Sequence, residues 1–207
     1  MKNLIRSTTQ LALAFASQYL SPGDAVIDAT CGNGNDTVAL ARMGAGNIYA
    51  FDIQKKAMEQ TKAALIREGL YSENIRLIED SHARMADYVA EKVKVILFNL
   101  GYLPSASKTL VTKKETTLAA VSQGLRLLRK DGLLCVTMYS GHPGGAEEKQ
   151  ALLDFARTLD EKKYHVAYIN MLNQRNHPPE LLLITLKWGV EHEKDENRMY
   201  AGTCQQQ

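Results

Sequence analysis

The chain is poor in cysteine, lacks a long apolar run and has no excess of one charge. Its 207 residues include only Cys31, Cys135 and Cys204, with no C-x-x-C spacing and no nearby pair of histidines. This pattern argues against structural zinc and favours reduced, packed thiols, so the cytoplasm is the compartment that we expect. No apolar run approaches the roughly 20 residues that a membrane span requires. We therefore expect neither a metal site nor a membrane segment.

The charge balance leaves the class of partner open. Lysine and arginine total 25, aspartate and glutamate total 23, and the net charge is +2. This balance permits an RNA partner without arguing for one, because a nucleic-acid footprint is a local basic patch. Residues 3–20 carry apolar side chains at mostly helical spacing, with polar residues between them and no small-residue cleavage site. We predict an amphipathic helix of the mature protein there, not a signal peptide.

What the chain does contain is a regular alternation of short apolar runs and helical patterns. The apolar runs predict strands at 25–29, 47–51, 75–78, 93–98, 133–138, 164–171 and 181–188. The helical patterns cover 36–43, 55–68, 116–128 and 147–159, with a short helix through 85–89. Such alternation predicts an α/β protein with a parallel sheet that has helices on both faces. One domain over residues 1–189 accounts for the pattern, and a charged, flexible tail follows at 190–207.

The most informative stretch runs from Val26 to Asp36 and reads VIDATCGNGND. A buried strand ends on Asp28, Gly32 and Gly34 follow, and a helix begins next to Asn35. Strand, glycine turn and helix start in this order form a nucleotide-type cofactor loop at the carboxyl edge of a parallel sheet. The glycines let the backbone approach a ligand, and the helix start offers free N–H groups.

The glycine pattern also discriminates between cofactors. Asp52 ends the next strand, 24 residues after Asp28, about where a carboxylate meets the hydroxyls of a ribose. Dinucleotide sites use G-x-G-x-x-G so that a helix start faces a pyrophosphate, but here the third glycine is missing. Asp36 at the helix start would repel a pyrophosphate and would suit a cofactor with a sulfonium and an ammonium group. The pattern favours S-adenosylmethionine over NAD.

Four strings carry a resemblance to known proteins. DATCGNG at 28–34 resembles the first motif of class I methyltransferases, usually D-x-G-x-G-x-G, with Thr30 in place of the first glycine. Together with FNLGYLP at 98–104, KETT at 114–117 and YSGH at 139–142, it resembles one narrower family, first labelled rRNA methylases. That family includes the tRNA methyltransferase that acts on the aminomethyl group at carbon five of the wobble uridine. The likeness covers about residues 5–188 and implies a Rossmann-like fold with a seven-stranded, mostly parallel sheet.

The resemblance implies a division of the cofactor site among the strand ends. The turn around Gly34 would line the methionine end, Asp52 and its neighbours would hold the ribose and flank the adenine, and Asp80 would lie at the adenine edge. The cofactor-binding residues that we expect are Asp28, Asn33, Gly34, Asn35, Asp36, Asp52, Ile53, Gln54, Asp80, Ser81, His82 and Asn99.

The acceptor site is expected at the end of the strand that precedes Asn99. Asn99 and the loop after it resemble, in loosened form, the N-P-P-Y loop of amino-methylating enzymes. We expect the Asn99 side chain and the Leu100 carbonyl to hold the amine, with Tyr102 as a pocket wall. Tyr139 and His142 would close the other side, and His142 is a candidate proton acceptor, although a dedicated base is not required.

Basic residues after this loop are candidates for RNA phosphate contacts. Lys108, Lys113 and Lys114 lie at the mouth of the expected pocket. Arg126, Arg129 and Lys130 extend the basic character along the next helix, and Arg175 and His177 lie between the last two strands.

The leading hypothesis is an S-adenosylmethionine-dependent N-methyltransferase that converts 5-aminomethyl-(2-thio)uridine to 5-methylaminomethyl-(2-thio)uridine in the anticodon region of tRNA. The resemblance also suggests a homodimer. Two alternatives stay open: methylation of rRNA or of a small-molecule amine, and a non-catalytic module that binds the cofactor or RNA. Simpler roles also compete, because Asp80 to His82 fits a helix cap, His142 a tight turn and the lysines an ordinary surface.

Overall fold

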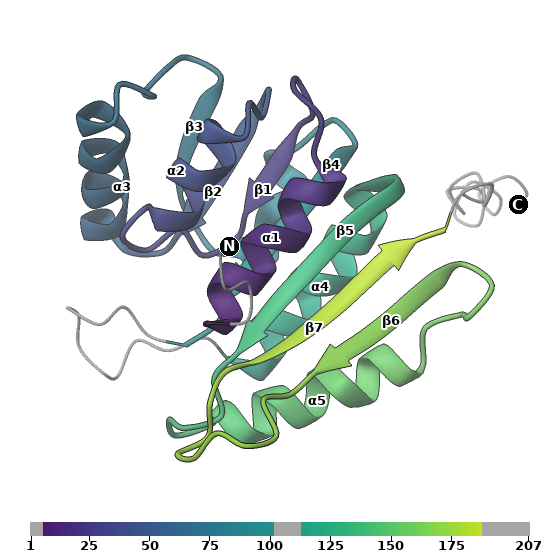
Figure 1. The fold of residues 1–207 in the computed structure, drawn as a ribbon. Helices are drawn as coiled ribbons and strands as arrows, with labels where there is room; N and C mark the ends of the chain where they lie inside the picture. Colours follow the sequence, from purple (N-terminus) through teal and green to yellow (C-terminus); the bar gives the residue numbers. More distant parts are fainter. Residues whose placement is uncertain (1–5, 102–112, 188–207) are drawn as a thin grey trace, which may run out of the picture.

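A seven-stranded sheet in the order β3-β2-β1-β4-β5-β7-β6 forms the centre of the protein (Figure 1). The computed structural model describes residues 6–101 and 113–187. The strands are β1 (Val26–Asp28), β2 (Ile48–Asp52), β3 (Ile75–Glu79), β4 (Val93–Asn99), β5 (Leu128–Met138), β6 (Tyr164–Ile169) and β7 (Glu180–Leu186). The helices are α1 (Thr8–Tyr19), α2 (Asn35–Arg42), α3 (Lys55–Arg67), the 3₁₀ helix η1 (His82–Asp87), α4 (Lys114–Leu127) and α5 (Gly145–Arg157).

The strand order places the site at a topological switch point. β1, β2, β3, β4 and β5 pair in parallel, and β7 lies antiparallel between β5 and β6. The chain builds outward from β1 to β3 and then returns to place β4 on the other side of β1. The connections that leave β1 and β4 therefore diverge, which opens a crevice at their carboxyl ends. The predicted seven-stranded, mostly parallel sheet is confirmed.

Two apolar layers hold the helices on the sheet. Helices α1, α2 and α3 cover one face, with Val26 of β1 in the layer beneath them. Helices η1, α4 and α5 cover the other face, with Ile27 of β1 in that layer. Because both faces are buried, the central strands are nearly continuous apolar runs. No helix in the described ranges is long and apolar enough to cross a bilayer.

Several predicted boundaries are wrong, most clearly for β5. The sequence places the start of this strand at residue 133, but β5 begins at Leu128, directly after α4. Leu128 pairs with Val93, and the register then shifts as the chain passes Asp131, whose φ is 57°. The polar residues 129–132 look like a turn in the sequence, whereas here they form an irregular part of the strand.

Smaller differences affect the ends of other elements. Helix α4 begins at Lys114 rather than 116, and α5 covers Gly145–Arg157 rather than 147–159. β6 ends at Ile169, and β7 begins at Glu180, which pairs with Met138. The first residues of the N-terminal helix prediction and the tail at 190–207 lie outside the described ranges.

Candidate functional site

The glycine turn after β1 is held tightly against α3. Gly34 has a φ of 83° and precedes α2, and Gly32 has a φ of 51°. A Cβ atom on Gly34 would lie 2.8 Å from Cα of Thr61, and the Thr61 hydroxyl donates to the Gly32 carbonyl at 3.3 Å. Both glycines therefore serve the left-handed backbone, and Gly34 also allows α3 to pack against the turn. Asn33 and Asn35 on either side of Gly34 are exposed.

Asp28 lies beneath the turn, and its carboxylate forms hydrogen bonds with residues of the turn and of α2. Its carboxylate accepts hydrogen bonds from the Thr37 hydroxyl at 2.6 Å and from the Thr30 N–H at 3.3 Å. Burial, together with the negative charge of Asp36, raises the pKa of Asp28 to about 7. Asp28 is 1% exposed, and its observed hydrogen bonds shape the turn. Its contact with the cofactor stays a prediction.

Thr30 joins the turn to the end of β4. The Asn99 N–H donates to Oγ1 of Thr30 at 2.7 Å, across 69 positions of the chain. In the sequence Thr30 is only a departure from the glycine of the methyltransferase motif. Sequence reasoning missed this role, which becomes visible once β1 and β4 are known to be neighbours.

Asn99 and Asp36 meet at the centre of the crevice. Nδ2 of Asn99 donates to Oδ2 of Asp36 at 3.4 Å. This bond directs the amide nitrogen of Asn99 to Asp36 and leaves its carbonyl oxygen available to another donor. Asp36 is 8% exposed, and its Oδ1 has no hydrogen-bond partner among the described residues. Burial raises the pKa of Asp36, while the hydrogen bond from Asn99 lowers it.

Asp52 links the end of β2 to the same turn. Its carboxylate accepts hydrogen bonds from the Gly32 N–H at 3.2 Å and from the Gln54 N–H at 3.0 Å. Each oxygen keeps a lone pair for a further donor, as two vicinal hydroxyls would require. Burial raises the pKa of Asp52, and Ile53 beside it is 56% exposed. The strand end that the sequence assigns to the ribose therefore lies directly beside the glycine turn.

The end of β3 contributes one polar cluster and one buried histidine. Asp80 accepts a hydrogen bond from the Tyr88 hydroxyl at 2.6 Å and forms an ion pair with Arg84 at 3.0 Å, and the bond from Tyr88 lowers the pKa of Asp80. Ser81 caps η1 by accepting the Ala83 N–H. Tyr88 and Arg84 were missed in the sequence because their link to Asp80 depends on the η1 turn.

His82 faces inward at this strand end. It is 9% exposed, and its Nδ1 lies 3.2 Å from the Ala29 carbonyl of the turn. Its ring packs edge-on against Phe98, with 5.8 Å between the ring centres. Burial lowers the pKa of His82, so the ring is neutral at pH 7 and Nδ1–H donates to Ala29. The observed role of His82 is to pack beneath the turn, against Ala29 and Phe98. Its contact with the cofactor stays a prediction.

The acceptor side is formed by the ends of β4 and β5. Leu100 donates its N–H to the Thr137 carbonyl at 2.9 Å, and Gly101 packs against the ring of Tyr139. Tyr139 is half-buried, and His142 approaches Pro143 O through Nδ1 at 3.0 Å. The structure thus brings Asn99, Leu100 and Tyr139 together, as predicted. Tyr102 and Lys108 lie outside the described residues.

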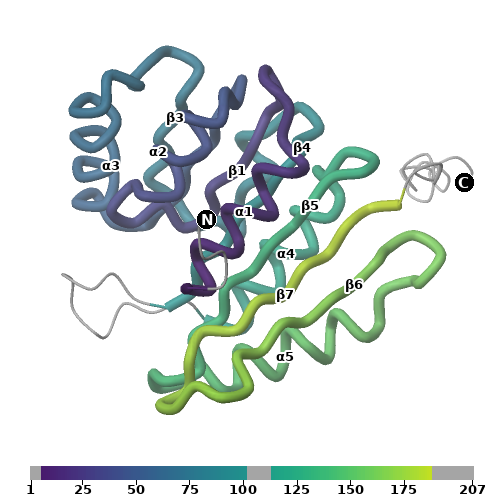
Figure 2. Tube along the Cα trace, viewed as in Figure 1, coloured from purple at the N-terminus to yellow at the C-terminus, as the bar shows by residue number. Residues whose placement is uncertain are grey.

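The basic residues divide between the two edges of the sheet. Lys113 and Lys114 lie at the start of α4, at the carboxyl edge with the glycine turn. The β6–β7 loop with Arg175 reaches the same edge, because Glu180 pairs with Met138 at the end of β5 (Figure 2). Arg129 is at the opposite edge, where it pairs with Asp24 at 2.6 Å.

The predicted extension of this basic surface along α4 is therefore wrong. Lys92, which immediately precedes β4, donates to the Arg126 carbonyl, and Leu128 pairs with Val93. A helix of 14 residues spans about 20 Å, so its last turn lies far from the crevice. Arg126, Arg129 and Lys130 do not belong to the surface around the site.

The chemistry of the site suits a cationic cofactor. The turn from Val26 to Asp36 contains two aspartates and no lysine or arginine, and Asp52 approaches it from β2. The charged side chains that a pyrophosphate would meet there are all negative, whereas a sulfonium with an ammonium group is complementary to them. Among the described residues no group of three His, Cys, Asp or Glu side chains is arranged to hold a metal ion.

One named relative matches this chain over most of its length. A chloroplastic tRNA (mnm(5)s(2)U34)-methyltransferase from Arabidopsis thaliana is 38% identical over 181 residues. The aligned part covers 82% of this chain and 66% of that relative, so the chain spans just under two thirds of the relative's length.

Solved structures match it as well. A protein from Clostridium thermocellum described as a "putative rRNA-methylase" has 38% identity and a TM-score of 0.84, covering 87% of this chain and 98% of that one. A protein from Streptococcus mutans described as a "putative methyltransferase", solved in complex with SAH, has 40% identity and a TM-score of 0.79, covering 89% of this chain and 98% of that one.

Fold, glycine turn and these likenesses define a class I methyltransferase, an enzyme class that uses S-adenosylmethionine. A family model described as "Putative rRNA methylase" matches residues 48–185. The chain belongs to this family, and the family resemblance found in its sequence is confirmed.

Proposed function

We propose that this protein transfers a methyl group from S-adenosylmethionine to the aminomethyl group of 5-aminomethyl-(2-thio)uridine at the wobble position of tRNA. The product is 5-methylaminomethyl-(2-thio)uridine. The observation that carries the proposal is the Asn99 amide, whose nitrogen is bound to Asp36 so that its oxygen is left for an amine. The likeness to the Arabidopsis enzyme named for this nucleoside supports the choice of acceptor.

The ends of β1, β2 and β3 each bind a different part of the cofactor. When bound, S-adenosylmethionine supplies an electrophilic methyl group on a positively charged sulfur. Asp52 holds the ribose with its two carboxylate oxygens, and Gln54 and Ile53 flank the adenine. The exposed Asn33 and Asn35 lie along the methionine end. Asp80 and Ser81 contribute the adenine edge.

The end of β4 positions the acceptor. Methyl transfer is an in-line displacement, so orientation supplies much of the rate. Asn99 Oδ1 and the Leu100 carbonyl accept N–H bonds from the amine and so direct its lone pair. Tyr139 and Tyr102 are the walls that confine the uracil. His142, which follows β5, is the residue that we propose to pass the released proton to solvent.

The partner that we propose is the anticodon region of tRNA. The residues that contact its phosphates in this proposal are Lys113 and Lys114 at the start of α4, Lys108, which precedes them in the sequence, and Arg175 in the β6–β7 loop. The compartment that we propose for the protein and its tRNA substrate is the cytoplasm. We also propose that the protein acts as a homodimer. Light scattering at assay concentrations checks the dimer.

Nucleoside analysis tests the reaction itself. Incubation of the purified protein with S-adenosylmethionine and tRNA that carries the aminomethyl nucleoside should convert it to the methylaminomethyl form, as measured by mass spectrometry. A strain without the gene should accumulate the unmethylated form. Unchanged nucleosides in both experiments would refute the proposal. Methylation of a free amine that ignores both tRNA and salt would show a small-molecule enzyme instead.

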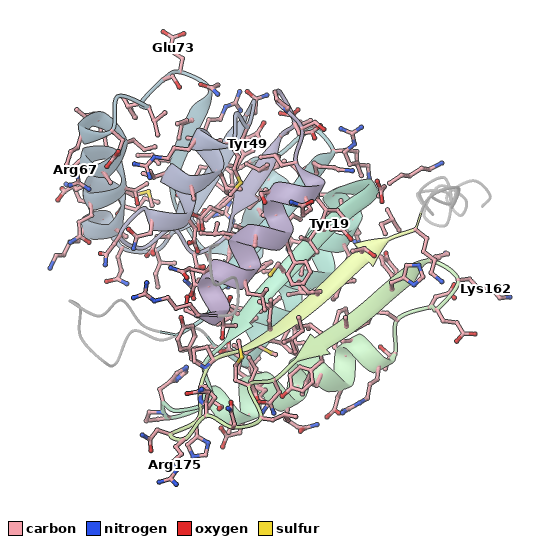
Figure 3. The ribbon with its side chains drawn as sticks, in the orientation of Figure 1. Tyr19, Tyr49, Arg67, Glu73, Lys162 and Arg175 are labelled. Atoms are coloured by element: carbon pink, nitrogen blue, oxygen red, sulfur yellow. The ribbon has the colours of Figure 1, made fainter. Side chains whose placement is uncertain are left out.

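Salt dependence tests the phosphate contacts. We expect Lys114→Ala and Arg175→Ala each to raise KM for tRNA and to make the slope of log affinity against log salt shallower by about 0.7 to 0.9. The matched control is Lys162→Ala, because Lys162 is an exposed cation near the other end of β6 (Figure 3). An equal effect of all three substitutions on the slope would mean that these contacts are not localised at the carboxyl edge.

A further inference from the structure

The least satisfied group in the crevice is the carboxylate of Asp36. It is 8% exposed, and only one of its oxygens has a hydrogen-bond partner among the described residues, the amide of Asn99 at 3.4 Å. An unpartnered buried carboxylate oxygen destabilises a folded protein, so such an atom marks a place where a donor is expected. The buried carboxylate of Glu148 differs, since it accepts the Thr117 hydroxyl at 2.6 Å.

Among the described residues, no lysine, arginine or histidine pairs with Asp36. The titratable groups near it are Asp28 on β1 and the buried thiol of Cys135 on β5, whose pKa is raised by burial and by the charge of Asp36. Asn99 on β4 is the neutral donor. The described residues therefore leave Oδ1 of Asp36 open to a donor from a ligand. The Asn99 amide that Asp36 orients is the group proposed to hold the substrate amine.

We propose that Asp36 acts on the acceptor amine: Oδ2 fixes the Asn99 amide with its oxygen toward the amine, and Oδ1 takes the proton of the incoming ammonium. This inference rests on the proposed function. It reassigns Asp36, which the sequence pattern places with the cofactor.

The proton balance is simple. A primary alkyl ammonium has a pKa of about 10, so at pH 7 the substrate arrives without a lone pair. Asp36 accepts one proton from it and becomes a neutral acid. The amine lone pair then forms the new N–C bond as the C–S bond breaks, and the electron pair of that bond stays on sulfur. The product leaves as a secondary ammonium, and Asp36 returns its proton to solvent.

The burial of Asp36 supports this role. Burial raises the pKa of its carboxyl group, which makes the carboxylate a stronger base than an exposed aspartate. The hydrogen bond from Asn99 opposes that shift, because it favours the charged form of the carboxyl group. A carboxyl group that is buried and has a single hydrogen-bond partner is suited to gain and lose a proton within one turnover.

The test is the pH profile of Asp36→Asn, an isosteric change. At pH 7 we expect kcat to fall about 100-fold, while the dissociation constant for S-adenosylmethionine, measured by calorimetry, stays within about threefold of wild type. The activity of the variant should then rise roughly tenfold per pH unit from pH 7 to 9, because only the amine that has already lost its proton reacts. The wild-type profile should be nearly flat over this range, because Asp36 removes that proton.

A second readout does not depend on activity. Burial raises the pKa of Asp36 in the folded state above its unfolded value, so the carboxyl group lowers the stability of the ligand-free protein once the pH exceeds the unfolded value. Asp36→Asn should therefore raise the melting temperature by about 2–4 °C at pH 8, and the difference should shrink as pH falls and Asp36 gains a proton. Glu148→Gln, which removes a satisfied buried carboxylate, should lower the melting temperature and leave the shape of the pH profile unchanged.

The outcomes separate this inference from the function on which it rests. Wild-type protein that does not methylate the aminomethyl nucleoside refutes the proposed function. With an active wild type, loss of cofactor affinity in Asp36→Asn, or activity that does not recover at high pH, would assign Asp36 to the cofactor or to the fold and overturn the inference. Should the variant not fold, a wild-type profile that climbs tenfold per pH unit up to the pKa of the amine would overturn it equally.

Discussion

Replacement of Asn99 by alanine should lower kcat by about 100-fold or more, with the affinity for S-adenosylmethionine nearly unchanged. The side chain ends β4, its backbone N–H is bound to Thr30, and its amide nitrogen is bound to Asp36. Alanine keeps the backbone bond and so keeps the turn in place. It removes the oxygen that orients the amine, so the loss appears in the chemical step.

Single-turnover kinetics with the cofactor prebound measures this effect. A matched control is Asn47→Ala, because Asn47 also donates its side-chain amide to a carboxylate, that of Glu91 at 2.7 Å, but lies before β2 at the opposite edge of the sheet. The control should retain full activity. If Asn99→Ala instead lost cofactor affinity and kept kcat, Asn99 would belong to the cofactor site alone.

The complementary substitution, Asp52→Ala, should raise the dissociation constant for S-adenosylmethionine by about 100-fold. Hydrogen bonds to a charged group contribute roughly 1.5–3 kcal/mol each, and Asp52 is placed to accept two from the ribose. Turnover at saturating cofactor should fall far less. Calorimetric titration of the ligand-free protein is the measurement.

A structural effect must be separated from a binding effect at this position. Asp52 also accepts the N–H groups of Gly32 and Gln54, so alanine loosens the turn as well. Asp52→Asn keeps an acceptor for one of these bonds, and we expect it to bind with intermediate affinity and to unfold within a few degrees of wild type. If Asp52→Ala and Asn99→Ala both lost only binding, the division between cofactor and acceptor residues would be wrong.

The fold was accessible from the sequence because its information is local. Apolar runs such as Val93 to Phe98 and the helical pattern from Lys55 define strands and helices through the spacing of neighbouring residues. Boundaries were less accurate where pairing decides them. Leu128 belongs to β5 because it pairs with Val93 of β4. The polar residues after Leu128 do not by themselves predict a strand.

The site was only partly accessible, for the same reason. Asp28, Gly34, Asp52 and Asn99 could be placed together because each follows a strand, and the carboxyl ends of parallel strands share one edge. Tyr88 could not be linked to Asp80, because that contact depends on the turn of η1.

By itself, the sequence determined that a strand, a glycine turn and an acidic helix start come in succession, and that an asparagine ends a later strand. The composition of this stretch then favoured S-adenosylmethionine over a cofactor bound through its pyrophosphate, since the stretch holds acids and no bases. Only the tertiary structure decided how these pieces act on one another. Thr30 and Asp36 both reach Asn99, across 69 and 63 positions of the chain, and Arg129 is carried to the opposite edge. These outcomes follow from which strands lie side by side, a property of the folded sheet that no local spacing of residues encodes.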